Sequence, residues 1–315
     1  MNIVLLGAAG FIGTNLSIEL LKSSKDSLTL VDKNISFFSQ TVLDSIQREK
    51  IIISNMDKKT NWDDILNGQE VVYHLISTTV PTTSNMHIVQ ELEANVIVSA
   101  NIFEACVRQG VKKIVFISSG GTVYGKTNSC PLSETYLTEP INSYGIQKLT
   151  IEKLLHLYYC MYNLDYRIVR LSNPYGPYQR PNGVLGVITT FTYNALKGRT
   201  LQVYGDGSVV RDFIYIEDAV RGILNIANGT SMYRLFNLGC GYGTSIKDVV
   251  NIIINTLDAK IGVQYTKARN VDVPINYLDI SRYESCFGKL SPIGLSDGIK
   301  KTADFLLDRI DAGIY

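Results

Sequence analysis

Several residue types that mark other classes of protein are scarce in this chain of 315 residues. The five cysteines are scattered and odd in number, so they form neither a disulfide framework nor a CxxC metal site. The three histidines stand far apart, and we expect no metal site. The net charge is +1 without a long basic run, which leaves no electrostatic footprint for nucleic acid.

Long apolar runs are missing too. None approaches the length that crosses a membrane, and the apolar residues 2–6 lead into glycines without the basic stretch that opens a signal peptide. We therefore expect a cytoplasmic protein without a membrane partner. Hydrophobic residues still make up 45% of the chain, which is enough for one large or two closely packed domains.

A glycine-rich segment follows the first predicted strand, and an apolar pattern of helical spacing follows the glycines. In such a strand–turn–helix unit, Gly7 permits a tight turn. Gly10 lets the backbone approach a pyrophosphate, and Gly13 allows close packing of helix on strand. The segment therefore predicts a dinucleotide-binding site.

The second predicted strand, residues 28–31, ends in Asp32, about 20 residues past the glycines. A carboxylate there accepts hydrogen bonds from an adenosine ribose and repels a 2′-phosphate, so NAD is favoured over NADP. Asp57 follows a third predicted strand at 51–53, where it could meet an adenine edge.

Strands and helices continue to alternate along the first half of the chain. The pattern predicts strands at 71–76, 111–117 and 166–171, helices at 91–109 and 144–162, and a terminal helix at 298–306. Such alternation predicts an α/β Rossmann fold, a doubly wound parallel sheet with ligands at the carboxyl ends of its strands. We expect residues 1–170 to form this NAD-binding domain. Residues 171–315 should form a smaller α/β substrate-binding domain, with segments crossing between the two.

A tyrosine and a lysine, Tyr144 and Lys148, stand four positions apart at the start of a predicted helix. On a helix they share one face, so both can reach the same cleft. An adjacent ammonium favours the phenolate, which would lower the tyrosine pKa and let its oxygen exchange a proton with a substrate hydroxyl. Alone, the pair also fits an amphipathic helix with a surface lysine. The glycine-rich segment favours the catalytic interpretation.

The glycine-rich segment, the serine-rich turn ending in VYG at 118–125 and the Tyr144–Lys148 pair together resemble one known family. It is the extended short-chain dehydrogenase/reductase family, the NAD-dependent sugar epimerases and dehydratases. The resemblance covers nearly the whole chain and implies NAD as cofactor and a nucleotide-diphosphate sugar as substrate. The cofactor-binding residues that it implies are Gly7, Gly10, Phe11, Ile12, Gly13, Asp32, Lys33, Asp57, Leu75, Asn95, Ser118, Tyr144 and Lys148.

The second half of the chain carries three further similarities to this family. Residues 170–177 resemble a segment whose asparagine contacts the diphosphate, and residues 201–215 resemble one whose arginine binds phosphate. Residues 268–274 are similar to a segment of galactose-type epimerases with a phosphate-binding arginine and a ribose-binding aspartate. The substrate-binding residues so implied are Asn173, Leu185, Val203, Tyr204, Arg211, Arg269, Asp272 and Asn276.

The turn before VYG distinguishes reactions within the family. Dehydratases carry an Asp-Glu acid pair where this chain has Gly121 and Thr122, which disfavours water elimination. The resemblance then implies hydride transfer at the sugar C4, as in a 4-epimerase, with Tyr144 as the acid/base. A reductase of 4-keto sugar nucleotides is the alternative, and a non-catalytic NAD-binding sensor is a more distant one. The nucleotide is expected to be UDP, with dTDP as its rival.

Epimerases of the family place a serine or threonine, which bonds the reacting sugar oxygen, at the position of Gly120. A catalytic hydroxyl donor must therefore come from elsewhere in this chain. Thr122, Ser119 or one of residues 77–79 could supply it, and Thr122 is our candidate catalytic residue.

In galactose-type epimerases a bulky tyrosine closes the sugar pocket against 2-acetamido groups. Alignment without a gap places Asn276 there, which predicts that UDP-N-acetylhexosamines are accepted alongside hexoses. A slip of one residue would place Tyr277 at that position and close the pocket.

The helices predicted at 91–109 and 144–162 are expected to pair with their counterparts across a twofold axis in a homodimer. The second helix has more apolar positions than one core-facing stripe needs, namely Leu154, Leu155, Leu157, Tyr158 and Met161. The alternative is a helix buried on two sides within the monomer.

Overall fold

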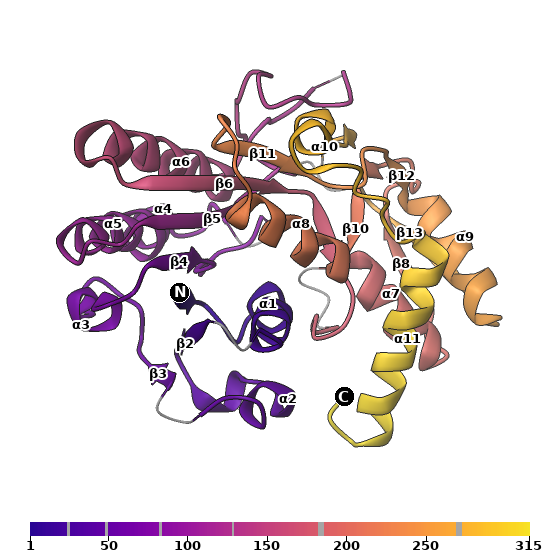
Figure 1. Ribbon diagram of the computed structural model, residues 1–315. Helices are drawn as coiled ribbons and strands as arrows, with labels where there is room; N and C mark the ends of the chain where they lie inside the picture. The colour runs from indigo at the N-terminus through magenta and orange to yellow at the C-terminus, as the bar shows by residue number, and fades with distance from the viewer. Residues whose placement is uncertain (24–25, 48–49, 82–83, 128, 182–185, 269–272) are drawn as a thin grey trace.

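A parallel sheet of seven strands forms the centre of the computed structural model, which describes residues 1–315 except 24–25, 48–49, 82–83, 128, 182–185 and 269–272 (Figure 1). The strands are β1 (Asn2–Leu6), β2 (Ser27–Asp32), β3 (Ile51–Ile53), β4 (Val71–His74), β5 (Lys113–Ser119), β6 (Asp165–Leu171) and β11 (Leu235–Leu238). They lie in the order β11-β6-β5-β4-β1-β2-β3, and each neighbouring pair is parallel. The predicted Rossmann fold is confirmed.

Helices cover both faces of this sheet (Figure 1). They are α1 (Phe11–Leu21), α2 (Gln40–Leu43), α3 (Trp62–Leu66), α5 (Val98–Arg108), α6 (Ser143–Tyr162) and α8 (Ile216–Asn228), with a 3₁₀ turn, η1 (Ile35–Phe37). Side chains alternate along β1, so Ile3 and Leu5 pack with α1 and α8 while Val4 and Leu6 pack with α5 and α6. A strand buried on both faces must be apolar throughout, which is why β1 shows no alternation in its sequence.

The helix predicted at 91–109 starts earlier and is irregular. It begins as α4 (Ile88–Leu92), passes through a π-helical turn, η3 (Glu93–Ile97), and continues as α5. Single π turns are frequent at functional sites, and Asn95 stands in this one. The other predicted elements of the first half lie within a few residues of the observed ones.

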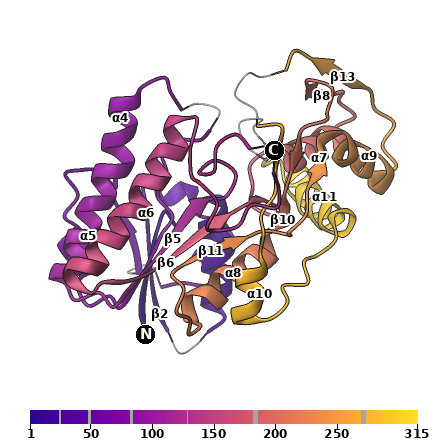
Figure 2. The same ribbon diagram turned by 90° about the horizontal axis from the view of Figure 1, so that it is seen from above.

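A second group of small sheets and helices lies beyond the carboxyl ends of the central strands, and Figure 2 shows it to one side of the sheet. Its strands are β7 (Asn173–Tyr175), β8 (Leu201–Tyr204), β9 (Val210–Arg211), β10 (Phe213–Tyr215), β12 (Thr244–Ser245), β13 (Val263–Thr266) and β14 (Ile275–Asn276). Its helices are α7 (Val187–Leu196), α9 (Ile246–Leu257), α10 (Ser281–Phe287) and α11 (Leu295–Asp311). The pairs β7–β10 and β8–β13 and the trio β12-β9-β14 form its sheets, and α11 packs on α7 and α9.

The chain crosses between the two groups more than once. After β10, helix α8 returns to the central sheet and β11 extends that sheet by pairing with β6. The division near residue 170 therefore stays a prediction, with 216–238 placed in the first unit by their packing.

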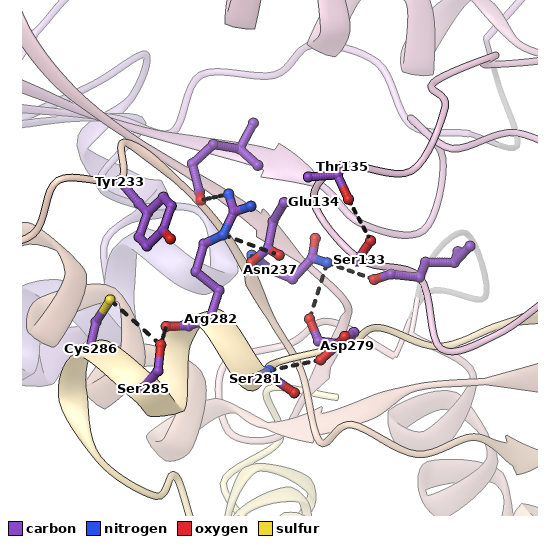
Figure 3. A network of polar contacts seen from close by, with 12 residues as sticks. Ser133, Glu134, Thr135, Tyr233, Asn237, Asp279, Ser281, Arg282, Ser285 and Cys286 are labelled. Atoms are coloured by element: carbon purple, nitrogen blue, oxygen red, sulfur yellow. Dashed lines mark hydrogen bonds and ion pairs between the residues drawn. The ribbon is translucent and has the colours of Figure 1, made fainter.

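A buried polar network attaches the C-terminal segment to the edge of the central sheet (Figure 3). The side-chain amide of Asn237 in β11 donates to the carbonyl oxygens of Leu132, at 2.7 Å, and Asp279, at 3.2 Å. Its backbone N–H donates to Glu134 at 2.9 Å, and Arg282 Nε lies 3.5 Å from the same carboxylate. The network joins Asp279 and Arg282, which follow β14, to the edge strand β11.

Helix α6 keeps part of its apolar surface exposed. Leu155 is buried against the sheet, and Leu154 and Tyr158 pack on the same cluster. Leu157 and Met161 instead point away from it and are 47% and 59% exposed.

No helix in the described part of the chain combines the length and apolar character that a membrane crossing needs.

Candidate active site

The turn between β1 and α1 has the geometry that its glycines predicted. Gly7 adopts a φ of +86°, which an L side chain rarely takes, and its N–H donates to the Val31 carbonyl at 2.9 Å. A Cβ on Gly13 would lie 2.4 Å from the Gly7 oxygen, so only glycine fits there. Gly10 caps α1 without a side-chain hydrogen bond, and a Cβ on it would meet only the Gly7 oxygen, at 3.4 Å. The protein itself leaves room at Gly10, on the side where a phosphate would approach.

The residues expected around the cofactor divide into two groups. Gly7, Gly10, Phe11, Ile12, Gly13, Leu75, Ser118, Tyr144 and Lys148 all line one cleft of about 920 Å³. The others lie outside its described lining. The Asp32 carboxylate ends β2 and accepts hydrogen bonds from the backbone N–H groups of Ala9, at 2.8 Å, and of Lys33, at 2.7 Å. Asp57 accepts from the N–H of Lys59 at 2.8 Å in the loop after β3.

Asn95, also expected to bind the cofactor, is buried and bonded within the protein. Its Oδ1 accepts from the Thr78 backbone N–H at 2.9 Å, and its Nδ2 donates to Gln147 Oε1 at 2.7 Å. It therefore joins the loop after β4 to helix α6. The π turn aims its side chain at this loop, so Asn95 positions the cleft wall rather than lining it.

Tyr144 and Lys148, the predicted catalytic pair, lie where the predicted helix places them. Helix α6 begins after Asn142, whose side chain accepts from the Gly145 N–H at 2.8 Å, which satisfies one of the free donors of the first turn. Tyr144 is partly buried and hydrogen-bonds Ser119. Lys148 is buried one turn further on, where its Nζ donates to the Ile117 carbonyl at 2.9 Å and lies 5.7 Å from the centre of the Tyr144 ring.

Burial dominates the ionisation of both side chains. It raises the pKa of Tyr144 to about 12, with the hydrogen bond from Ser119 acting in the opposite direction. It lowers the pKa of Lys148 to about 8, against the pull of Glu152. The expectation that the ammonium lowers the tyrosine pKa is therefore corrected for this structure, in which desolvation outweighs the neighbouring charge.

The serine-rich turn identifies a hydroxyl donor for the site. A Cβ on Gly120 would point at the Leu278 side chain, 2.6 Å away, and not into the cleft. Ser119 and Thr122 both line the cleft, as do Ser77 and Thr79. Ser119 is the residue already bonded to Tyr144, whereas the buried Thr122 hydroxyl has no hydrogen-bond partner among the described residues. Of the donors named from the sequence, Ser119 is thus the one that contacts Tyr144, and Thr122, our candidate catalytic residue, is the one with a free hydroxyl among the described residues.

The predicted substrate residues are also divided by the structure. Asn173, Tyr204 and Arg211 line the second half of the same cleft. Val203 does not, since its side chain is buried in the core and the neighbouring positions of β8 face outward. Leu185, Arg269 and Asp272 lie outside the described residues.

Asn276 stands behind the cleft wall. It is fully buried in β14, and its Nδ2 donates to the Gly120 carbonyl at 3.2 Å. Tyr277, the alternative gate, is outside the described lining as well and approaches Gly243. The predicted gate position is corrected accordingly: neither side chain belongs to the described lining of the cleft.

Residues 3–239 match the model of the NAD-dependent epimerase/dehydratase family. The chain belongs to this family. A putative UDP-glucose 4-epimerase of Methanocaldococcus jannaschii is 33% identical over 309 residues, 96% of this chain and 98% of that protein. The dTDP-4-dehydro-6-deoxyglucose reductase of Escherichia coli is 30% identical over 95% of each chain. The crystal structure of Thermotoga maritima UDP-glucose 4-epimerase with UDP-glucose superposes with a TM-score of 0.91 at 29% identity, covering 98% of this chain and 100% of that one.

Family membership confirms the predicted resemblance, the enzyme class and NAD as the cofactor. The turn after β1 fits that cofactor, because it offers the free N–H groups of a helix N-terminus, no acidic residue in the first turn of α1, and open space at Gly10. Within the described residues, His, Cys, Asp and Glu do not gather in any group of three or more that could hold a metal ion.

Several residues that line the cleft were not predicted from the sequence. Gln202 faces the cleft from β8, and Arg199 precedes it. The alternation of Leu201 and Val203 with polar neighbours was the available signal, because an apolar–polar alternation marks the inward and outward faces of a strand. Lys148, Arg199 and Arg211 are the charged residues of the described lining, which contains no Asp or Glu.

Proposed function

We propose that this protein is an NAD-dependent 4-epimerase of nucleotide-diphosphate sugars, with UDP-hexoses as the main substrates. One observation carries the choice within the family: the described lining combines Tyr144 and Lys148 with hydroxyl side chains and contains no carboxyl group. Elimination of water from the sugar needs an acid/base in addition to the tyrosine, whereas epimerisation at C4 requires one proton-transfer group.

The chain's own residues supply binding, orientation and proton transfer. NAD, held at the turn between β1 and α1, would supply the hydride acceptor and donor for the sugar C4. Tyr144 exchanges the proton of the 4-oxygen, and Ser119 orients the phenol by its hydrogen bond. Burial raises the pKa of the phenol to about 12, so the free enzyme holds it protonated at neutral pH. Oxidation of the 4-hydroxyl needs the phenolate as proton acceptor, and the resulting phenol returns the proton to the 4-oxygen when the keto-sugar is reduced. Each nearby positive charge favours loss of that proton, and the Lys148 ammonium provides one.

The distribution of charge along the cleft agrees with a sugar that must present both of its faces to the cofactor in turn. Arg199 and Arg211 provide positive charge in the half lined by the second group of elements, where a diphosphate would bind. The other end is lined by Val80, Pro81 and Ile141 together with small hydroxyl residues. Strong binding of the nucleotide diphosphate and weak binding of the sugar would let the sugar turn between the two hydride transfers.

Acceptance of 2-acetamido sugars remains part of the proposal, although Asn276 does not line the cleft. The sugar end is bounded by the small side chains Ser77, Thr79 and Thr122, and the Thr122 hydroxyl is buried without a partner among the described residues. A hydroxyl in that situation gains from an acetamido oxygen or N–H, because an unsatisfied buried polar group is costly.

The test is a product analysis of the purified enzyme with UDP-glucose, UDP-galactose, their N-acetyl counterparts and dTDP-glucose, with and without added NAD but with no reductant. Interconversion of the C4 epimers to an equilibrium mixture is expected. The E. coli relative suggests the competing outcome, in which a dTDP-4-keto-6-deoxyhexose is reduced with one equivalent of NAD(P)H consumed. That consumption without any epimerisation would contradict the proposal, and binding of NAD with neither reaction would indicate a sensor.

A further inference from the structure

Three consecutive residues at the carboxyl end of β5 each bond one residue of α6, and the α6 residues are spaced four apart. The pairs are Ile117 with Lys148, Ser118 with Glu152, and Ser119 with Tyr144. A four-residue spacing places the three α6 side chains on one helix face, directed at the strand. Glu152 thus continues the catalytic face by one more turn.

Glu152 is a buried carboxylate with every oxygen bonded. Its side chain is 3% exposed. Oε1 accepts from Ser118 Oγ at 2.5 Å and from Arg170 Nε at 3.1 Å, while Oε2 accepts from Arg170 Nη2 at 2.7 Å. Arg170 and Ser118 are register partners on the adjacent strands β6 and β5, so the sheet presents both donors to the same carboxylate.

The charges around Glu152 alternate in space. On one side stands the Arg170 guanidinium, whose carbon lies 4.9 Å from the centre of the Tyr124 ring. On the other, one helical turn back, stands the Lys148 ammonium, which donates to a neutral carbonyl at Ile117. Glu152 is therefore the acidic group whose charge acts on the buried Lys148 and favours its ammonium form, and Arg170 and Ser118 hold it in place.

We propose that Glu152 is a positioning residue of the active site, which keeps the Lys148 ammonium charged and in place beside Tyr144. Its carboxylate does so through its own bonds to Arg170 and Ser118, which fix it against β5. The functional part of this inference rests on the proposed role of Lys148 in proton transfer. The electrostatic part does not, since it concerns the charge of Lys148 in the protein itself.

The other ionisable groups near Lys148 come from each element around it. Tyr144 and Glu152 share its helix, Arg170 approaches Glu152 from β6, and His74 approaches from β4. Burial lowers the pKa of His74 to about 3, and its ring bonds Ser99, so it stays neutral across the assay range. Lys148, with a pKa of about 8, is the member of this set that titrates between pH 6 and 10.

The direct test is the replacement Glu152→Gln, which keeps the shape of the side chain and removes its charge. Competitive acetylation of amines by acetic anhydride across pH 5–10, followed by peptide mass spectrometry, reads the titration of Lys148 without any turnover. Loss of the negative charge one helical turn from Lys148 should lower the Lys148 pKa by about 1 unit or more. The alkaline limb of kcat/KM against pH should move to lower pH by the same amount.

The matched control is Glu91→Gln, a second buried carboxylate that bonds α6. Glu91 accepts from Ser143 Oγ at 2.6 Å and from Gln147 Nε2 at 3.1 Å. Both donors lie in the first turns of α6, before Glu152. Removing its charge should weaken the start of α6 without moving the titration of Lys148.

A variant that folds even if the single one does not is Glu152→Gln with Arg170→Gln, since it leaves no uncompensated buried arginine. Glu152→Gln should titrate Lys148 at lower pH than the wild type, and Glu152→Asp should restore part of the difference. The double variant should show a smaller shift in the same direction, because the loss of the Arg170 cation, which lies beyond Glu152, favours the charged lysine. An unchanged Lys148 titration in folded Glu152→Gln, or a Lys148 pKa above that of the wild type in the double variant, overturns the proposal whatever the substrate is. A shifted titration with an unshifted pH profile would keep the electrostatic role and refute the role of Lys148 in the proposed reaction.

Discussion

Alanine substitutions at two glycines of the turn between β1 and α1 should have opposite effects: one should weaken NAD binding and the other should destabilise the fold. At Gly10 a Cβ would lie 3.4 Å from the Gly7 oxygen, an ordinary van der Waals distance, and the backbone there (φ −71°, ψ 171°) suits any residue. At Gly13 a Cβ would lie 2.4 Å from the Gly7 oxygen and 2.7 Å from the Ala8 oxygen. Both contacts are with backbone, which cannot move aside cheaply.

The expected magnitudes follow from these distances. Gly10→Ala should cost the free protein only ~0.5–1 kcal/mol, because alanine is a poorer N-cap than glycine. Gly13→Ala should cost ~3 kcal/mol or more, at the upper end of overpacking, because no side chain can yield. For NAD the order reverses: a methyl group at Gly10 stands where the diphosphate must approach, so affinity should fall about tenfold or more.

Thermal unfolding with and without NAD measures both effects. At 100 times its dissociation constant NAD stabilises the wild type by ~2.7 kcal/mol, and a tenfold weaker complex at the same concentration by ~1.4 kcal/mol. Gly10→Ala should therefore unfold near the wild-type temperature without NAD and gain less from it. Undiminished NAD binding by Gly10→Ala would refute the placement of the diphosphate at this turn. Asn15→Ala, further along α1, serves as the control for a general effect on the helix.

Three other predictions concern catalysis, cofactor choice and assembly. Tyr144→Phe should keep NAD binding and lower turnover by about 10²–10⁴-fold, whereas Lys148→Ala should harm both, as calorimetry and product assays will measure; near-full activity of Tyr144→Phe would refute the mechanism. Asp32→Ala should shift the NADP-to-NAD affinity ratio by about tenfold in favour of NADP, because a ribose acceptor and a repelling charge are lost together, and equal affinities in the wild type would contradict this role. Light scattering at micromolar concentration should show a dimer that Met161→Lys dissociates and Met232→Lys, at an exposed position away from α6, does not; a monomeric wild type would exclude the pairing of α6 across a twofold axis.

The sequence predicted the fold and the position of each motif along the strands, because both depend on local patterns. The glycines follow β1, Asp32 ends β2 and the serine-rich turn begins within β5, and in a parallel sheet these carboxyl ends all meet at one edge. The same reasoning placed Tyr144 on the face of a helix beside that edge. Periodicity is enough for these conclusions.

The direction of individual side chains depends on contacts between distant residues, which a local sequence pattern does not contain. Asn95 turns from the cleft because it bonds Gln147, 52 positions later. The Cβ direction of Gly120 points at Leu278, 158 positions later, so counting back from VYG could not locate the hydroxyl donor. Val203 is different: the alternation along β8 was readable, and Gln202 was the position that it indicated.

The buried charges behind Lys148 also show why a sequence motif can be shorter than the structure that it serves. Burying Lys148, Glu152 and Arg170 costs each ion its hydration, and replacing such a group by apolar residues is often neutral or stabilising. The stability of the fold therefore does not explain why three ions are buried in its interior. A lysine that must remain charged beside a tyrosine gains from a nearby anion, and the bonds from Arg170 and Ser118 hold Glu152 in that position. The tyrosine–lysine spacing is the visible part of an arrangement that extends through Glu152 to the neighbouring strand.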